Sequence, residues 1–588
     1  MKSGLNITFW IAGSLICMSQ SAHAQRAIVP PEQTHAQTQV HPEIPPILSQ
    51  DDHQHYRAVF AAISREDWES VENLLEERPT GLLSGMAQAE YYLHANSPRI
   101  ELPQIASWLE RGVQLPQAEQ MVRLGLRRGL NEQPELPQAN RMIWQGSASL
   151  RARPKRVQDG TMPNDIAGAI LQRISDDDPA GARLLLDGID ATLSDEARAE
   201  WRQRVAWSYY IENQDPSSFA MAQTARAGRG DWVAEAEWTA GLAAWRLNDC
   251  ANAADSFRRA ASGARNAELR TAAYYWASRA LIRCRKPGEA QDELRRAAGF
   301  DETLYGMLAA EQLGQPLPDR TTGIRLDSKD WRKLSREENV RIAAALVQIG
   351  EDGLADEMLR HQARVGPTSH FGELGRLARA LGLPATQLYL AHNAPRGERS
   401  DRTLRYPVAS WAPANGWRVD PGLAFAHTLQ ESRFQTGAIS PAKARGLMQI
   451  TPITVRQHAP RLNLNARYGD LDNPRINLAF GQQNLEMLRD SSGTQGKLPK
   501  IMAAYNAGLT PVTRWNHEVR DFDDPLLYME SIPYWETRSY VAIVMRNYWM
   551  YQRNAGIGSP SKDSLVRNAW PTFPKANDTN RHSMEARY

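Results

Sequence analysis

The chain has 588 residues but lacks a long uninterrupted apolar run after its first residues. A helix that spans a bilayer needs roughly 18 or more consecutive apolar residues, and no later segment reaches that length. We therefore expect no stable membrane insertion. Charge of one sign is also lacking, because the net charge is only +2. A nearly balanced surface does not indicate nucleic acid as a partner.

Cysteine is scarce, with only three in the chain, and the first of them, Cys17, lies in an N-terminal segment of a distinct kind. That segment has a charged start at Lys2, an apolar run over 7–18 and a small-x-small pattern ending at Ala24. These features predict a signal peptide, residues 1–24, that is cleaved after Ala24 on export.

Cleavage would leave Cys250 and Cys284, which stand 34 residues apart. An Arg-Arg-Ala-Ala run follows each cysteine, at 258–261 and 295–298. This spacing fits stacked helical hairpins of the tetratricopeptide kind, in which equivalent positions of adjacent hairpins lie side by side. We therefore expect a Cys250–Cys284 disulfide in an oxidising compartment. Two buried free thiols and a compact Ala-rich bundle are the alternatives.

Strand patterns are lacking up to about residue 310, and apolar residues recur at helical spacing instead. The sequence after the signal peptide therefore predicts five segments in order. They are a flexible leader over 25–50, an α-superhelical region over 51–314, a helical linker domain over 329–395, a C-terminal domain over 401–555 and a loose tail over 556–588.

The C-terminal domain contains an almost wholly apolar helix that ends in a carboxylate. Asp420 and Pro421 indicate its start, since Asp caps a helix and Pro suits the first turn. Glu431 lies at the expected C-terminal end, where the helix dipole and apolar neighbours both raise a carboxyl pKa. A general acid that works near neutral pH needs a raised pKa. The alternative is that Glu431 simply ends a helix in water.

Three further motifs follow in order. Glu431 opens Glu-Ser-x-Phe, and Ser440 and then Gly-Leu-Met-Gln-Ile-x-Pro at 446–452 come after it. Ala-Tyr-Asn-Ala-Gly occupies 504–508, and Glu-Ser-Ile-Pro-Tyr-Trp-Glu-Thr-Arg-Ser-Tyr-Val occupies 530–541. This ordered set resembles the catalytic domain of the soluble lytic transglycosylases (the Slt type), enzymes with a goose-lysozyme-like fold that cleave peptidoglycan.

The resemblance implies a predominantly α protein, with a long α-superhelical region of helical hairpins followed by a lysozyme-like, mainly α catalytic domain. It implies a periplasmic enzyme whose partner is the glycan strand of peptidoglycan and which needs no cofactor or metal. Glu431 would act first as acid and then as base, cleaving the bond between N-acetylmuramic acid and N-acetylglucosamine and leaving a 1,6-anhydro end. The alternatives are a lysozyme-like hydrolase and a non-enzymatic, glycan-binding helical scaffold.

The same resemblance implies that four residues line the substrate cleft: Ser440, Gln449, Tyr505 and Glu536. Tyr505 would help to hold the reacting sugar, and Glu536 would contact the muramic-acid end or its peptide. Two alternatives remain, a buried core ring for Tyr505 and an ion pair with Arg538 for Glu536.

Three further positions bear on the predicted site. Glu530 is, with Glu536, a candidate second carboxylate by its place in the third motif. Thr451 stands where the family usually has Met, and Lys443 stands where it usually has Gly. The first change affects the apolar wall beside the sugar, and the second alters a loop. The acid itself is retained.

Overall fold

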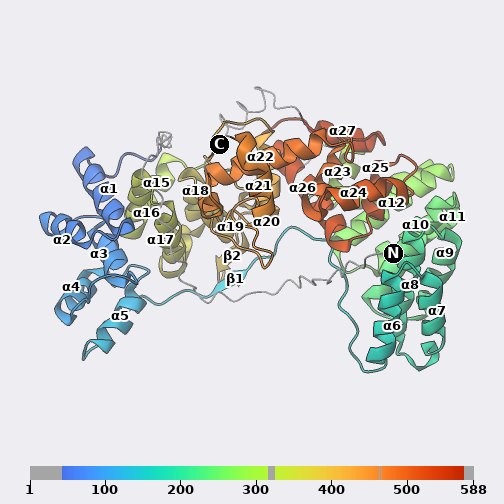
Figure 1. The fold of residues 1–588 in the computed structure, drawn as a ribbon, viewed down its shortest axis with the longest axis horizontal. Coiled ribbons are helices and arrows are strands. Elements are labelled where there is room, and N and C mark those ends of the chain that lie inside the picture. The colour runs from blue at the N-terminus through green and yellow to red at the C-terminus, as the bar shows by residue number, and fades with distance from the viewer. Residues whose placement is uncertain (1–42, 316–324, 463, 465, 575–588) are drawn as a thin grey trace.

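The structure is a computed structural model that describes residues 43–315, 325–462, 464 and 466–574. It is helical almost throughout, and the sheet found in the described residues is a single antiparallel pair of short strands (Figure 1). No helix in this described part combines the length and the apolarity that crossing a bilayer requires.

The first five helices form one helical lobe together with the predicted linker domain. The five are α1 (Gln50–Ser64), α2 (Trp68–Glu77), α3 (Ser84–Leu93), α4 (Leu102–Gly112) and α5 (Ala118–Arg127). Their partners are α15 (Ser328–Leu334), α16 (Glu338–Ile349), α17 (Asp352–Val365), α18 (Phe371–Ala380) and α19 (Pro384–His392). The two sets share one hydrophobic core and lie side by side in Figure 1.

This shared core changes the predicted division of the chain. Residues 51–314 do not act as a single packing unit, because α1–α5 bury their apolar faces against α15–α19 rather than against α6. The predicted leader is also anchored at its end. Ile44 is buried, and the backbone N–H groups of Ile47 and Leu48 donate to Gln348 Oε1 at 3.1 and 3.2 Å.

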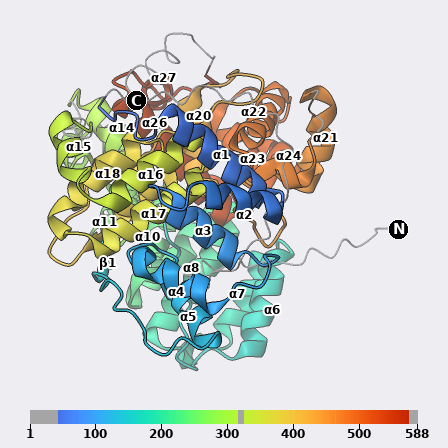
Figure 2. The same cartoon turned by 90° about the vertical axis from the view of Figure 1, so that its left-hand side faces the viewer.

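The superhelical part consists of helices that pack in chain order, each on the next. They are α6 (Asn164–Ser175), α7 (Pro179–Asp187), α8 (Asp195–Ile211), α9 (Asp215–Thr224), α10 (Asp231–Arg246), α11 (Cys250–Gly263), α12 (Ala267–Arg283), α13 (Pro287–Ala298) and α14 (Leu304–Gln312). Sequential packing of this kind is that of stacked hairpins rather than of a closed bundle. Figure 2 shows the lobes from the side of α1–α5.

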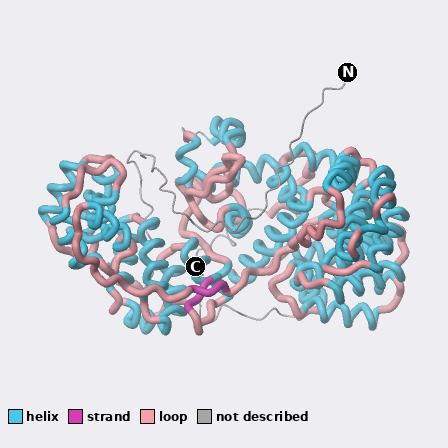
Figure 3. The backbone as a smooth tube through the Cα atoms, turned by 90° about the horizontal axis from the view of Figure 1, so that it is seen from below, coloured by secondary structure: helices cyan, strands magenta, loops and turns pink. Residues whose placement is uncertain are grey.

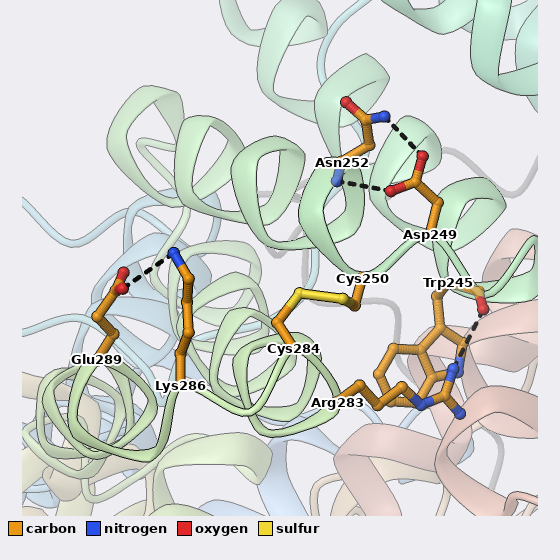
Figure 4. The surroundings of a disulfide bond; sticks show 8 residues. All are labelled: Trp245, Asp249, Cys250, Asn252, Arg283, Cys284, Lys286 and Glu289. Atoms are coloured by element: carbon orange, nitrogen blue, oxygen red, sulfur yellow. Dashed lines mark hydrogen bonds and ion pairs between the residues drawn. A yellow bond between two sulfur atoms is a disulfide. The ribbon is translucent and has the colours of Figure 1, made fainter.

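The predicted disulfide is present and ties two adjacent hairpins. Cys250 is the first residue of α11, after the N-cap Asp249, and Cys284 ends α12. Their Cα atoms are 5.5 Å apart and their sulfur atoms are bonded (Figure 4). The turns of two adjacent hairpins therefore meet at this disulfide, although one cysteine begins a helix and the other is a C-cap.

We expect reduction of this disulfide to lower the stability of the superhelical part. A cross-link over a loop of this length typically contributes about 2–4 kcal/mol. Denaturant unfolding with and without reductant measures the change, and a Cys250→Ser, Cys284→Ser double variant should match the reduced protein. Alkylation of both thiols in the untreated protein, seen by intact mass, would contradict the bond.

A segment that lies within the predicted α-superhelical region but forms no α-helix links the first lobe to the superhelical part. This crossing segment, residues 139–157, includes β1 (Met142–Trp144), which pairs with β2 (Asn393–Pro395) in antiparallel register. Figure 3 shows the strand pair between the helical lobes. The sequence reading found no strand pattern here because β1 is only three residues long.

The C-terminal domain packs directly on the superhelical part. Its helices are α20 (Pro421–Glu431), α21 (Pro452–Leu462), α22 (Pro474–Asp490), α23 (Leu498–Ala507), α24 (Leu509–Glu518), α25 (Pro525–Ser531), α26 (Trp535–Asn554) and α27 (Pro560–Val566). One hydrophobic core includes residues of α10–α14 and of this domain. Tyr210 also hydrogen-bonds Ser531 at 2.8 Å across the boundary. The domain is therefore supported by the helices before it.

The prediction of a loose tail over 556–588 is wrong for its first part. Residues 560–566 form α27, whose Leu565 is buried in the core, and Ser561 accepts a hydrogen bond from the Trp549 indole at 2.9 Å. Phe573 donates its backbone N–H to Gly496 O at 2.9 Å. Residues 575–588, like the predicted signal peptide, lie outside the described residues.

Candidate active site

Helix α20 carries Glu431 as its last residue, as predicted. Asp420 caps the N-terminus by accepting from Gly422 N at 2.8 Å, and its other oxygen accepts from the Tyr548 hydroxyl at 3.0 Å. The first eight residues of α20 are all buried. A fully packed helix fixes the place where its final side chain leaves the core, so the position of Glu431 is set by the core.

The environment of Glu431 favours the protonated carboxyl. Burial raises the pKa of Glu431 to about 7, and the charge of Glu536 acts in the same direction. A hydrogen bond from the Tyr540 hydroxyl to Glu431 Oε1, at 2.6 Å, opposes this rise because it stabilises the carboxylate. The carboxyl is thereby poised to exchange its proton near neutral pH, as a general acid and base must.

The loop after Glu431 turns back sharply and brings Ser440 into a tight turn. Arg433 and Phe434 adopt φ values of 53° and 63°, which reverse the chain direction at the helix end. Ser440 Oγ accepts the backbone N–H of Ala444 at 3.0 Å. Its hydroxyl hydrogen stays available for a donor role toward a bound group. Lys443 in the same turn is exposed and has a φ of 60°, a conformation that glycine adopts at less cost.

Gln449 is half-buried and helps to hold this loop. Its amide nitrogen donates to Ala438 O at 3.2 Å and to Gly446 O at 2.9 Å. Both side-chain amide hydrogens of Gln449 are therefore used inside the loop. A ligand would have to bind Gln449 through its Oε1, which can only accept a hydrogen bond.

Helix α22 holds this loop in place through the side chain of Asn477. Asn477 Oδ1 accepts from Met448 N at 2.8 Å, and its Nδ2 donates to Arg445 O and Leu471 O, each at 2.9 Å. A Cβ on Gly446, whose φ is 77°, would stand 2.1 Å from Asn477 Nδ2. These close approaches explain why glycine and asparagine occupy the two positions.

Tyr505 lies near the end of α23, with a partly buried ring and a hydrogen-bonded hydroxyl. The hydroxyl donates to Met448 O at 2.8 Å, and the ring lies 4.6 Å from the imidazole of His427. Burial and the nearby Glu431 raise the pKa of Tyr505 well above its usual value, so the phenol stays neutral. Its oxygen can still accept a hydrogen bond.

The two carboxylates of the third motif have different surroundings. Glu536 is exposed in the first turn of α26 and forms no ion pair with Arg538 in the described structure. Arg538 instead donates to Ile532 O and stacks on Trp207. Glu530 is buried and has partners of its own. It accepts from the Tyr305 hydroxyl at 2.7 Å and faces Arg151 at 3.9 Å.

The sequence reading missed one residue that contacts Glu431 and a second residue that contacts the first. Tyr540, quoted in the third motif without a role, donates to Glu431. His427 Nδ1 lies 2.7 Å from the same Tyr540 hydroxyl. Helical spacing could have indicated both, because Tyr540 is four residues after Glu536 and His427 is four residues before Glu431, and residues four apart share a helix face.

No group of three or more potential metal-ligating side chains is assembled anywhere in the described ranges. The site thus consists of one carboxyl with a raised pKa, two phenols, an imidazole and a hydrogen-bonded loop. Its carboxyl can give and take a proton near neutral pH.

Comparison with known proteins supports the assignment of this domain. Residues 410–527 match the family model described as the transglycosylase SLT domain. The soluble lytic murein transglycosylase of Escherichia coli (strain K12) is 32% identical over 133 residues, which cover 22% of this chain and 20% of that protein. Its counterpart in Salmonella typhimurium is 33% identical over 142 residues, 24% of this chain and 21% of the relative. The match thus spans about a fifth of each relative's length.

Solved structures extend the likeness to the whole fold. The 70 kDa soluble lytic transglycosylase from Escherichia coli superimposes with a TM-score of 0.54 at 15% identity, over 90% of this chain and 100% of that one. Lytic transglycosylase Slt from Pseudomonas aeruginosa, solved as an inactive mutant, gives 0.50 at 19% identity over 87% and 88%. The predicted fold class, a helical superhelix followed by a lysozyme-like domain, is confirmed.

Proposed function

We propose that this chain, which carries a transglycosylase SLT domain in residues 410–527, is a lytic transglycosylase that acts on peptidoglycan. The observation that carries the proposal is Glu431, a carboxyl with a pKa of about 7 at the end of the buried helix α20 of that domain. The predicted signal peptide and the disulfide support a proposal that the protein is exported and works in the periplasm.

In the proposed reaction Glu431 first protonates the oxygen that links N-acetylmuramic acid to N-acetylglucosamine. The acetamido group of the muramic acid supports the cationic centre that develops at C1. The Glu431 carboxylate then takes the proton of the C6 hydroxyl, whose oxygen attacks C1. The glycosidic bond is replaced by a 1,6-anhydro bond, the proton returns to Glu431, and no water is consumed.

The surrounding residues suit a single carboxyl that acts twice. Ordinary glycosidases hold two carboxylates on opposite sides of the bond. Of the two candidates for a second one, Glu530 is committed to Tyr305 and Arg151, and Glu536 is exposed. We propose that Ser440 donates to the substrate, that Gln449 Oε1 and the Tyr505 oxygen accept from it, and that Glu536 contacts the muramic-acid end or its peptide.

Mass spectrometry of the products from purified sacculi tests the proposal. A transglycosylase leaves 1,6-anhydro ends, whereas a lysozyme-like hydrolase leaves reducing ends that are heavier by one water. Anhydro products from the wild-type protein support the proposal. Reducing ends would show that the protein is a hydrolase. If the sacculi stay intact under all conditions, the protein would instead be a non-enzymatic, glycan-binding scaffold.

The pH dependence of the rate follows from the raised pKa of Glu431. The first step needs the protonated carboxyl, so kcat/KM should fall with increasing pH around pH 7. An ordinary glutamate would lose its proton near pH 4.5 and would give a descending limb there. Initial rates on soluble glycan oligomers between pH 4 and 9 measure the midpoint, and a descending limb centred below about pH 5.5 would contradict the assignment.

A further inference from the structure

The active-site carboxyl is the end of a chain of three hydrogen-bonded groups that begins at a buried imidazole. Glu431 Oε1 lies 2.6 Å from the Tyr540 hydroxyl, which lies 2.7 Å from His427 Nδ1. His427 is 0% exposed, and Tyr540 is 4% exposed. The chain runs from the surface-facing end of α20 into the core between α20 and α26.

Hydrogen counting fixes the direction of each bond. A phenol has one hydrogen, and an ionised carboxylate can only accept. When Glu431 is ionised, Tyr540 must therefore donate to it, and the phenol oxygen must accept from His427. That requires the neutral imidazole with its hydrogen on Nδ1 and a bare Nε2.

In the described structure the imidazole of His427 makes no other hydrogen bond. Its Nε2 is buried and has no partner among those residues. An unpaired buried polar atom costs free energy, and an apolar side chain would fill the space without that cost. Burial lowers the pKa of His427 to about 3, so the ring stays neutral throughout the working range. The hydrogen bond to Tyr540 is therefore the interaction that offsets the cost of burying His427.

We propose that His427 is a positioning residue for the Glu431 carboxyl, and that it acts by fixing Tyr540 as a hydrogen-bond donor to the carboxylate. The inference rests on the proposed function, in which Glu431 alternates between acid and base. An N–H···O–H···O⁻ chain is cooperative, because each bond polarises the next. His427 thereby strengthens the bond that stabilises the base form without adding a positive charge beside it.

The groups that face this chain are few. Tyr540 and Glu536 come from α26, and Tyr505 comes from α23. The charged residues of α22, which also packs on α20, are occupied elsewhere or exposed. They are Arg475, which is exposed, Glu486, which pairs with Arg418, and Arg489 and Asp490, which pair with each other. The field at Glu431 is therefore left to Glu536 and the hydrogen-bonded chain.

The expected effect is a shift of the pH profile rather than a loss of the reaction. In His427→Leu the donor to Tyr540 is gone, the bond to the carboxylate weakens, and the pKa of Glu431 rises. The descending limb of kcat/KM should move to higher pH by about half a unit to one unit. In His427→Asn the side-chain amide keeps an N–H near the position of Nδ1, and the midpoint should stay within about 0.3 units of wild type.

Leu423→Ala is the matched control, since Leu423 is buried on the same helix and takes no part in the chain. It should lower the melting temperature and leave the midpoint of the limb unchanged. A His427→Leu profile that is lower at every pH with the wild-type midpoint would show a packing role alone and would overturn the proposal. If wild-type protein releases no anhydro ends, the proposed function fails instead, which is a separate result.

The unsubstituted protein gives a second test that does not depend on a variant folding. Nitrogen NMR of histidine-labelled protein at pH 8, with the His427 signal assigned from its absence in His427→Asn, reports which ring nitrogen carries the hydrogen. The proposal requires the Nδ1-protonated form. The Nε2-protonated form would mean that Tyr540 donates to the histidine and not to Glu431, which would overturn it.

Discussion

Replacing Glu431 by glutamine is expected to lower the rate of anhydro-end formation by about 10²- to 10⁴-fold. The amide keeps the shape of the carboxyl and can accept the bond from Tyr540, but it has no proton of suitable acidity to give to the glycosidic oxygen. Product release from sacculi and from soluble oligomers, quantified by mass spectrometry, measures the loss.

The fold should survive this change, and the sign of the stability effect is itself a test. The pKa of Glu431 is raised in the folded protein, so ionising it opposes folding. That penalty is absent below the unfolded value near 4.5 and is complete above about 7. Glutamine does not ionise, so this penalty is absent in the variant. The melting temperature of Glu431→Gln should therefore equal or exceed that of wild type at pH 8 and should match it at pH 4.

Glu518→Gln is a suitable control, because Glu518 is an exposed glutamate of the same domain, paired with Arg514 on α24. It should keep wild-type activity and stability within error, since exposed pairs contribute about 0–1 kcal/mol. A Glu431→Gln protein that retains more than about a tenth of the wild-type rate would exclude Glu431 as the sole acid.

Local patterns in the sequence were sufficient to predict the helix that ends at Glu431 and the disulfide. The start of that helix and its apolar run are local signals, and Cys250 and Cys284 could be paired because a repeat carries its own register. The role of Glu431 as the acid came from the resemblance of the ordered motifs and stays a proposal. Local patterns could not predict the contact between Tyr540 and His427. Their contact joins α26 to α20 across more than a hundred residues, and neither helix shows on its own which residue the other presents.

Local patterns also could not predict how the long helical region divides into packing units. Residues 51–314 were expected to form one superhelix because their helices follow one another without a break. The structure instead buries α1–α5 against α15–α19, which lie about two to three hundred residues later. Amphipathic faces show that a helix packs, but many pairings of such faces would bury the same apolar area.

The crossing segment has the largest predicted effect on stability, through Arg151. Its guanidinium lies 3.0 Å from Glu235 on α10 and 3.9 Å from Glu530 on α25, and its side chain is only 9% exposed. The guanidinium also stacks over the indole of Trp238 at 4.9 Å. One residue thus neutralises a carboxylate of the superhelical part and a carboxylate of the third motif in the same buried place.

Arg151→Ala is therefore expected to lower the free energy of unfolding by about 3–5 kcal/mol, because it removes the cation that contacts both buried carboxylates. Arg183→Ala is the matched control. Arg183 pairs with Asp187 one turn away on the surface, and its loss should cost about 0.3–0.5 kcal/mol. Chemical denaturation followed by tryptophan fluorescence measures both.

A deficit of Arg151→Ala below about 1 kcal/mol would show that Glu235 and Glu530 do not depend on this arginine.

The same arginine connects stability to the active site, because its backbone oxygen accepts from Ser539 at 3.0 Å, and Ser539 precedes the Tyr540 that holds Glu431. Arg151→Ala keeps that backbone oxygen. If the crossing segment stays in place, the variant should retain the pH midpoint of wild-type activity at temperatures where it is folded. If the segment detaches, Tyr540 loses its support and the descending limb should move upward as in His427→Leu. Measuring both the unfolding curve and the pH profile of this one variant therefore tells whether the charge or the segment supports the acid.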